Sequence, residues 1–306
     1  MRGRVRAAVV VVLALAAAAL AGCGMSSSGG ADGRMTVVAT TTQLQDFTRN
    51  VGGSRINLRG LLRPNVDPHD YEPTPGDAAA VAGAKVLVVN GVGLDSWVDD
   101  VEKAAGADPR VVTASDGLRL RKGDAALPEG DPHIWMDPRN AERMVRNIEA
   151  GLVAADPAGA ATYRANAARY VARIRALDRR LAAEIAPFPP ARRLIVTDHD
   201  AFGYFAARYG IRVVGTVIPS LSTAAEPDAR QLTRLAATIR RSGVHAVFSE
   251  QSVNPRVARA IASEAGARLG RSLFGDSLGP AGSPAATYIG MMRANMASII
   301  DSFRGG

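Results

Sequence analysis

Two short stretches of the chain share a pattern whose residue types could bind a metal. Residues 67–73 read Asp-Pro-His-Asp-Tyr-Glu-Pro, and residues 131–138 read Asp-Pro-His-Ile-Trp-Met-Asp-Pro. Proline fixes its own φ and pushes the preceding residue into an extended conformation, so each stretch predicts a stiff loop that aims one imidazole. Neutral imidazoles beside carboxylates are typical ligands of transition metals. Because two of only four histidines, His69 and His133, lie in this frame, we favour a metal site over two ordinary turns.

Two further candidate ligands lie in the second half of the chain, each after a predicted strand. His199 follows the apolar run 194–197, and Asp276 follows residues 271–274. Parallel sheets bind ligands beyond the carboxyl ends of their strands, where both side chains would emerge. For Asp276 a turn aspartate stays open as the alternative, because Gly-Asp-Ser after a strand is ordinary turn chemistry.

The remaining polar candidates flank one short apolar run. His245 begins this predicted strand and is interpreted as structural, whereas Glu250 ends it. Glu250 either supports a metal ligand from behind or is a solvated carboxylate at the rim of the site. Four aromatic side chains near the motifs are interpreted as packing groups rather than binding groups: Trp97, Trp135, Phe202 and Phe205.

The elements that must position these residues alternate in both halves of the chain. In the first half, strands are predicted at 35–40, 56–62, 85–90 and 110–113, with helices at 44–51, 77–84, 94–105 and 138–155. In the second half, strands are predicted at 193–197, 212–217, 245–249 and 268–274, with helices at 199–209, 226–242, 255–265 and 287–303. Strands alternating with helices predict an α/β fold, so we expect two similar lobes, each a parallel sheet flanked by helices.

One long helix is predicted between the halves. Asp156-Pro157 supplies a cap and a first-turn proline, and three prolines at 187–190 end the helix. A helix of about 29 residues is about 43 Å long, enough to cross between lobes. A coiled-coil partner helix is the alternative, but its apolar stripe would last only about two heptads. The predicted boundaries are an N-terminal lobe at 34–155, a linking helix at 156–187 and a C-terminal lobe at 188–306.

The N-terminus has the pattern of a secretory leader. Three arginines precede an apolar run at residues 7–20, which is shorter than a membrane span of about 20 residues. Leu-Ala-Gly-Cys at 20–23 resembles a bacterial lipobox, in which Cys23 is lipidated; a plain signal peptide with an incidental cysteine is the alternative. We therefore expect a signal peptide at 1–22, a flexible Ser/Gly tether at 23–33, and a body anchored to the outer face of the bacterial cytoplasmic membrane.

Composition narrows the class of protein. The length of 306 residues suits about two domains. The formal charge is +8, and removing the three leader arginines leaves +5. Arginines are scattered without a basic block interleaved with aromatics, so a solvated surface is favoured over a nucleic-acid interface. Cys23 is the only cysteine, which excludes an intrachain disulfide and a cysteine-rich metal site.

Taken together, the motifs resemble the zinc- and manganese-binding solute-binding proteins of bacterial ABC importers, the ZnuA/TroA-like family. The two Asp-Pro-His stretches and residues 90–97, 199–205 and 248–250 carry the resemblance in the family's order. It implies two lobes joined by a single rigid helix, with the metal bound between them. It also implies delivery to a membrane permease driven by a cytoplasmic ATPase. The ligands implied by position are His69, His133, His199 and Asp276, in a protein expected to act as a monomer.

The choice of metal follows from the ligand set. In the resembling family the third ligand is histidine in some members and glutamate in others; three imidazoles and one carboxylate suit tetrahedral Zn²⁺, whereas Mn²⁺ prefers more oxygen. Such a site also binds Zn²⁺ more tightly than Mn²⁺ whichever ion it carries in the cell, so Mn²⁺ stays possible. Many zinc importers of the family carry a histidine-rich loop before the second histidine, but residues 115–132 contain four acidic residues and no histidine.

Two other functions would use the same residues. A zinc hydrolase could leave one metal position to water and use Glu250 as a general base, although Asp276 would close that position. An adhesin-like surface lipoprotein could use the metal only to hold the lobes together. We expect a binding protein rather than an enzyme, because the sequence has no His-Glu-x-x-His or similar metallohydrolase pattern.

Overall fold

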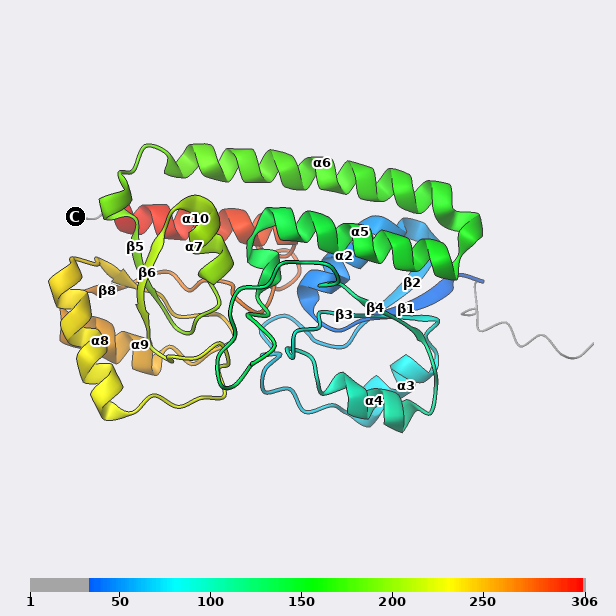
Figure 1. Ribbon diagram of the computed structural model, residues 1–306, viewed down its shortest axis with the longest axis horizontal. Helices are drawn as coiled ribbons and strands as arrows, with labels where there is room; N and C mark the ends of the chain where they lie inside the picture. The colour runs from blue at the N-terminus through cyan, green and yellow to red at the C-terminus, as the bar shows by residue number, and fades with distance from the viewer. Residues whose placement is uncertain (1–32, 305–306) are drawn as a thin grey trace, which may run out of the picture.

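The computed structural model describes residues 33–304 and contains two four-stranded parallel sheets, which lie side by side along its long axis (Figure 1). The strands of the first sheet are β1 (Met35–Ala39), β2 (Ile56–Gly60), β3 (Val86–Val89) and β4 (Arg110–Thr113), in the order β2-β1-β3-β4. The strands of the second are β5 (Leu194–Thr197), β6 (Arg212–Thr216), β7 (Ala246–Val247) and β8 (Arg268–Leu269), in the order β6-β5-β7-β8. The two sheets repeat one topology, so the predicted α/β fold of two similar lobes is confirmed.

Helices cover both faces of the N-terminal sheet. They are α2 (Thr42–Gly52), α3 (Pro75–Ala82), α4 (Val98–Ala105) and α5 (Pro138–Ala155). Successive side chains of a strand point to opposite faces: Val37 packs in the core under α2 and α5, and Val38 packs in the core under α3 and α4. A strand buried on both faces reads as an unbroken apolar run, which is why β1 and β3 could be predicted from the sequence.

The C-terminal sheet is covered in the same way. Its helices are α7 (Gly203–Tyr209), α8 (Ala229–Ser242), α9 (Arg256–Ala265) and α10 (Tyr288–Arg304). Val196 and Val247 pack against Leu235 and Ile261 of α8 and α9. The other face joins the large core that continues into the N-terminal lobe.

The long helix α6 (Ala160–Ile185) lies along both lobes (Figure 1). Its 26 residues give a length of about 39 Å. The predicted start differs in detail, because Pro157–Gly159 form a 3₁₀ turn before the α-helix, with Gly159 N donating to the Asp156 side chain. A second connection between the lobes was not predicted, and it is made by α10, which runs beside α6 (Figure 1). The ring of Tyr288, the first residue of α10, packs edge-on against Phe47 of α2, with ring centroids 4.9 Å apart.

Several predicted boundaries are wrong by a few residues near the candidate ligands. The helix predicted from 199 begins at Gly203, and the helix predicted from 94 begins at Val98. The strands predicted at 245–249 and 268–274 shrink to two residues each, followed by one isolated bridge between Glu250 and Leu273. Residues 198–202 and 274–278, which contain His199 and Asp276, therefore have irregular backbone.

Candidate metal centre

Both Asp-Pro-His motifs fold into the same local structure. In the first, Asp67 Oδ1 accepts a hydrogen bond from His69 N at 2.9 Å; in the second, Asp131 Oδ1 accepts one from His133 N at 3.0 Å. An aspartate that bonds the backbone two residues on makes an Asx turn, and the intervening proline stiffens it. The repeated sequence therefore forms the same turn twice, and each turn presents one histidine side chain.

Asp131 and Asp67 differ in the other hydrogen bonds that their carboxylates accept. Asp131 Oδ1 also lies 2.8 Å from His133 Nδ1, so it fixes the ring and turns Nε2 toward the other candidate ligands. Asp67 Oδ2 instead accepts from Thr223 Oγ1 at 2.7 Å, across to the C-terminal lobe. Only the second motif thus orients its own imidazole with its own aspartate.

One loop after β3 supports both motifs. Asn90 Nδ2 donates to Pro132 O at 3.1 Å, and Trp97 Nε1 donates to Pro68 O at 3.1 Å. The loop is itself held by buried Asp95, whose oxygens accept from Asn90 N and Gly91 N. The sequence interpretation assigned Trp97 to packing and missed Asn90. The available signal was that a buried indole N–H requires an acceptor.

The C-terminal half contributes His199 and Asp276. His199 lies two residues beyond β5, in a turn where its carbonyl accepts from Thr197 Oγ1 at 2.9 Å. Asp276 follows Gly275, whose carbonyl accepts from Trp135 Nε1 at 3.1 Å and from Gln43 Nε2 at 3.3 Å. Trp135 and Gln43 belong to the N-terminal half, so this loop is held from the opposite lobe.

These segments bring four side chains to one point. One ligand atom from each of His69, His133, His199 and Asp276 lies within 4.8 Å of all the others. His133 Nε2 is 3.3 Å from His69 Nε2 and 3.2 Å from His199 Nε2. Asp276 faces all three rings, with its oxygens 3.7, 3.3 and 3.2 Å from the Nε2 atoms of His69, His133 and His199. The group can hold a metal ion.

The group is sealed from solvent. The exposed fraction of the side chain is 2% for His69 and 0% for His133, His199 and Asp276. Both Asp276 oxygens are buried without a hydrogen bond from any described residue. A buried carboxylate without donors is costly unless cations compensate it, so the geometry suits a site that a metal ion completes.

The pKa values of these side chains are spread apart by their surroundings. Burial lowers the pKa of His69 to about 3. Burial also disfavours the charged form of His133, but the Asp131 and Asp276 carboxylates outweigh it and raise the pKa to about 9. The pKa of His199 is raised well above its usual value because Glu250 and Asp276 overcome the same burial penalty. For Asp276 the imidazoles overcome burial and hold the pKa well below its usual value. Near neutral pH, protons on His133 and His199 therefore compensate the Asp276 charge in the metal-free protein.

Glu250 lies behind His199, away from the point where the ligand atoms converge. Its Oε1 is 2.7 Å from His199 Nδ1, whereas His199 Nε2 faces Asp276. The two side chains form an ion pair. The pair is fully buried, and a Cβ at Gly275 would collide with Glu250 Oε2. Any larger residue at position 275 would therefore have to displace the Glu250 carboxylate.

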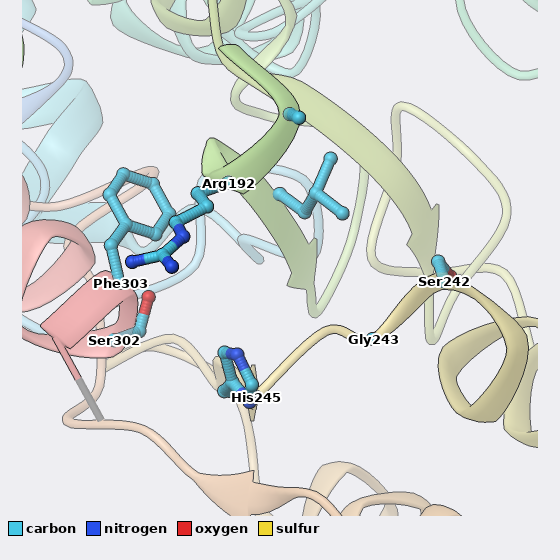
Figure 2. Close-up of a pocket in the computed structure, with 8 residues that line it drawn as sticks. Arg192, Ser242, Gly243, His245, Ser302 and Phe303 are labelled. Atoms are coloured by element: carbon cyan, nitrogen blue, oxygen red, sulfur yellow. The ribbon is translucent and has the colours of Figure 1, made fainter. Parts of the chain in front are cut away.

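The fourth histidine lies elsewhere. His245 is exposed at the amino end of β7, whereas Glu250 follows the carboxyl end of that strand. Its ring lines a cavity of about 210 Å³ together with Arg192, Ser302 and Phe303 (Figure 2). The structure therefore places His245 at the opposite edge of the C-terminal sheet from the four converging side chains.

The proposed leader is outside the described part of the chain. The signal peptide at 1–22, Cys23 and nearly all of the tether precede residue 33. Within residues 33–304, no helix combines the length and apolarity needed to cross a membrane.

Comparison with known proteins gives the class to which this fold and site belong. The family model described as "Zinc-uptake complex component A periplasmic" matches residues 37–302, and the chain belongs to this family. The chain is 33% identical over 294 residues to the manganese-binding lipoprotein MntA of Bacillus subtilis, covering 92% of this chain and 94% of MntA. It is 31% identical to the zinc-binding protein TroA of Treponema pallidum, covering 90% of this chain and 91% of TroA.

Solved structures agree with these relatives. The periplasmic zinc-binding protein TroA superposes with a TM-score of 0.83 at 29% identity, covering 89% of this chain and 99% of that one. The manganese-bound periplasmic metal-binding protein of Candidatus Liberibacter asiaticus gives a TM-score of 0.78 at 25% identity, covering 88% of this chain and all of that one. The relatives thus include proteins described as binding zinc and proteins described as binding manganese.

Proposed function

We propose that this protein captures Zn²⁺ outside the cytoplasmic membrane and delivers it to the permease of an ABC importer. The observation that carries the proposal is the convergence of three imidazole Nε2 atoms on a buried carboxylate without hydrogen bonds. The ligands are His69, His133, His199 and Asp276. A sealed site between two lobes suits a carrier, because it holds its cargo until the lobes part.

The geometry supports zinc as the cargo. A tetrahedral Zn²⁺ with bonds of about 2.0–2.1 Å would hold its ligand atoms about 3.3 Å apart. His133 Nε2 lies 3.2–3.3 Å from its three partners and His199 Nε2 lies 3.2 Å from Asp276, whereas His69 Nε2 lies 3.7 Å from Asp276. Three nitrogens and one carboxylate also give a set that Zn²⁺ accepts more readily than Mn²⁺. Manganese is the second candidate, since Asp276 turns both oxygens inward and relatives bind that ion.

We assign Glu250 the role of a partner that orients His199, with no direct contact to the metal. Its carboxylate lies at Nδ1, on the far side of the ring from Nε2. A general base of a zinc hydrolase would have to reach a water bound to the metal. From its position Glu250 would act on the ligand instead, and the family relatives are binding proteins, so the hydrolase alternative loses its support. Neither of these two relatives is described as an adhesin, so they give the adhesin alternative no support.

We further propose that a lipid on Cys23 holds the protein at the outer face of the membrane. The motif at 20–23 supports this, as do relatives described as lipoproteins. The lobe boundaries at 155/156 and 187/188 and the monomeric state remain predictions. The partners on this view are the metal ion, the permease with its ATPase, and the membrane through the lipid.

The function is tested by metal content and by stability. Protein purified without added metal should contain zinc when analysed by mass spectrometry. The metal-free protein should then unfold at a lower temperature, and Zn²⁺ at a thousandfold excess over Kd should restore about 4 kcal/mol of stability. His245→Ala, which lies outside the site, is the matched control. No change in the unfolding temperature of fully demetallated protein on adding Zn²⁺ or Mn²⁺ would rule out the metal site.

A further inference from the structure

The loop that precedes the second Asp-Pro-His motif reaches across to the opposite lobe. We refer to residues 118–131 as the strap; it follows β4 of the N-terminal lobe and leads directly into the loop that presents His133. It contains three acidic residues, three basic residues and no histidine, so metal capture does not explain its use. Its contacts show what it does instead.

The central contact is made by Asp124. Its Oδ2 accepts from Ser220 Oγ at 3.0 Å and from Leu221 N at 2.7 Å, both in the loop after β6 of the C-terminal lobe. Its Oδ1 accepts from Ala126 N and Leu127 N of the strap itself, each at 2.9 Å. Burial works against ionisation, but the four donors outweigh it and keep the pKa of Asp124 below its usual value. One oxygen therefore shapes the strap while the other binds the opposite lobe.

The strap is built to hold this shape. Asp124 N donates to Leu127 O, and a Cβ at Gly123 would collide with that same carbonyl. Gly130 has a φ of +150°, in a region that side chains rarely adopt. A loop with its own hydrogen bonds and required glycines presents Asp124 at a fixed position, so little ordering is lost when the lobes meet.

Two more contacts join the same surfaces. Tyr204 OH of α7 donates to Asp131 O at 3.0 Å and accepts from Arg121 N at 2.9 Å, at the two ends of the strap. Thr223 Oγ1 donates to Asp67 Oδ2, next to the other motif. Side chains of the C-terminal lobe thus bind beside both Asp-Pro-His motifs without touching the ligand atoms.

We propose that Asp124 and the strap form a latch that holds the two lobes closed over the bound metal and sets how slowly it leaves. The proposal rests on the proposed function. Because the four ligand side chains are sealed, the ion escapes only when the lobes separate, and separation must break the bonds of Asp124 and Asp67 to residues 220–223. Capture occurs before these bonds form, so the latch acts on release and leaves capture unchanged.

The experiment removes the latch from the side of the C-terminal lobe. Asp124 and Asp67 also hold their own loops, so the main variant is Ser220→Ala combined with Thr223→Val, which leaves both carboxylates in place. Asp124→Ala is the second variant. Glu129→Ala is the matched control, because Glu129 is an exposed carboxylate of the same strap. Zn²⁺ transfer to an excess of a fluorescent chelator, followed by stopped flow, measures the dissociation rate.

The double variant and Asp124→Ala should each release Zn²⁺ about tenfold faster, which corresponds to loss of hydrogen bonds to a charged acceptor. The association rate of the double variant should match wild type. Asp124→Ala also loses the hydrogen bonds within its own loop, so its metal-free form should unfold at a lower temperature than wild type. Glu129→Ala should behave as wild type throughout. Equal dissociation rates in wild type and the double variant would overturn the latch while leaving the metal site intact. If wild type itself takes up no Zn²⁺, the proposed function fails first.

Discussion

The zinc affinity of this protein should keep rising with pH well above neutrality. Unperturbed histidines, with a pKa of about 6.5, would confine the pH dependence to roughly pH 5–7. In the folded site the pKa of His133 is raised to about 9 and that of His199 is raised well above its usual value. A metal must displace these protons, because a ligating imidazole is neutral at the nitrogen that binds.

The magnitude follows from the shift of His133 alone. At pH 7 this side chain lies about two units below its pKa, so a metal must displace its proton in nearly every molecule. The affinity at pH 7 is then about fiftyfold below that at pH 9. His199 must also lose a proton to bind the metal, which makes the affinity rise more steeply with pH. His69 contributes nothing near neutrality, since its pKa is lowered to about 3 and it is already neutral. The logarithm of the affinity should therefore rise by between one and two units per pH unit.

Competition titrations with a chelator of known proton and metal affinity, at about pH 6, 7 and 8, measure this slope. Calorimetry in buffers of different ionisation enthalpy counts the same released protons independently. Asp131→Asn removes one carboxylate that raises the pKa of His133, so its slope should fall by about one, whereas Asp116→Asn, an exposed carboxylate, should keep the wild-type slope. A flat affinity above pH 7, with no protons released, would refute the reasoning.

Further predictions concern the ligand assignment, the Asp276 loop and the leader. Asp276→Ala should keep the fold and weaken Zn²⁺ at least about tenfold, about 1.4 kcal/mol, whereas His245→Ala should bind as wild type in the same titration; the reverse result would mean that the fourth ligand is misassigned. Gly275→Ala should displace Glu250, weaken zinc binding and destabilise the protein by about 1–3 kcal/mol in denaturant unfolding; a wild-type midpoint and affinity would contradict the contact. Cys23→Ser should abolish labelling with fatty acid, and normal labelling would show the lipobox interpretation to be wrong.

The fold was largely accessible from the sequence because its information is local. β1 and β3 are buried on both faces and therefore appear as apolar runs, and Pro157 before α6 and the three prolines at 187–190 after it mark its ends. Errors gather where regular structure stops, as at residues 199–202, since only the tertiary position of His199 decides that the helix must wait until Gly203. A periodic pattern predicts that a helix or strand exists, but it predicts poorly where that helix or strand ends next to a binding site.

The ligands could be predicted, whereas their supports could not. A histidine in a proline-stiffened turn carries its signal within a few residues. Asn90 and Trp135, in contrast, donate to carbonyls 42 and 140 residues away in the chain. The pKa spread has the same origin, because it arises when Asp276 meets three rings from distant segments. These hydrogen bonds and pKa shifts depend on which distant residues come together in the fold, and a local sequence pattern contains no information about those contacts.

The two Asp-Pro-His motifs show how one local device acquires two uses. Asp131 spends its capacity within its own lobe, so the orientation of His133 is set whether the lobes are open or closed. Asp67 fixes the backbone of His69 in the same way but bonds Thr223 of the other lobe, a contact that exists only on closure. His133 is therefore preorganised for the incoming metal, whereas the loop of His69 is tightened by the closing movement itself. The two turns are alike, and they differ in the further partner of the aspartate, which is the His133 ring within the same motif for Asp131 and Thr223 of the opposite lobe for Asp67.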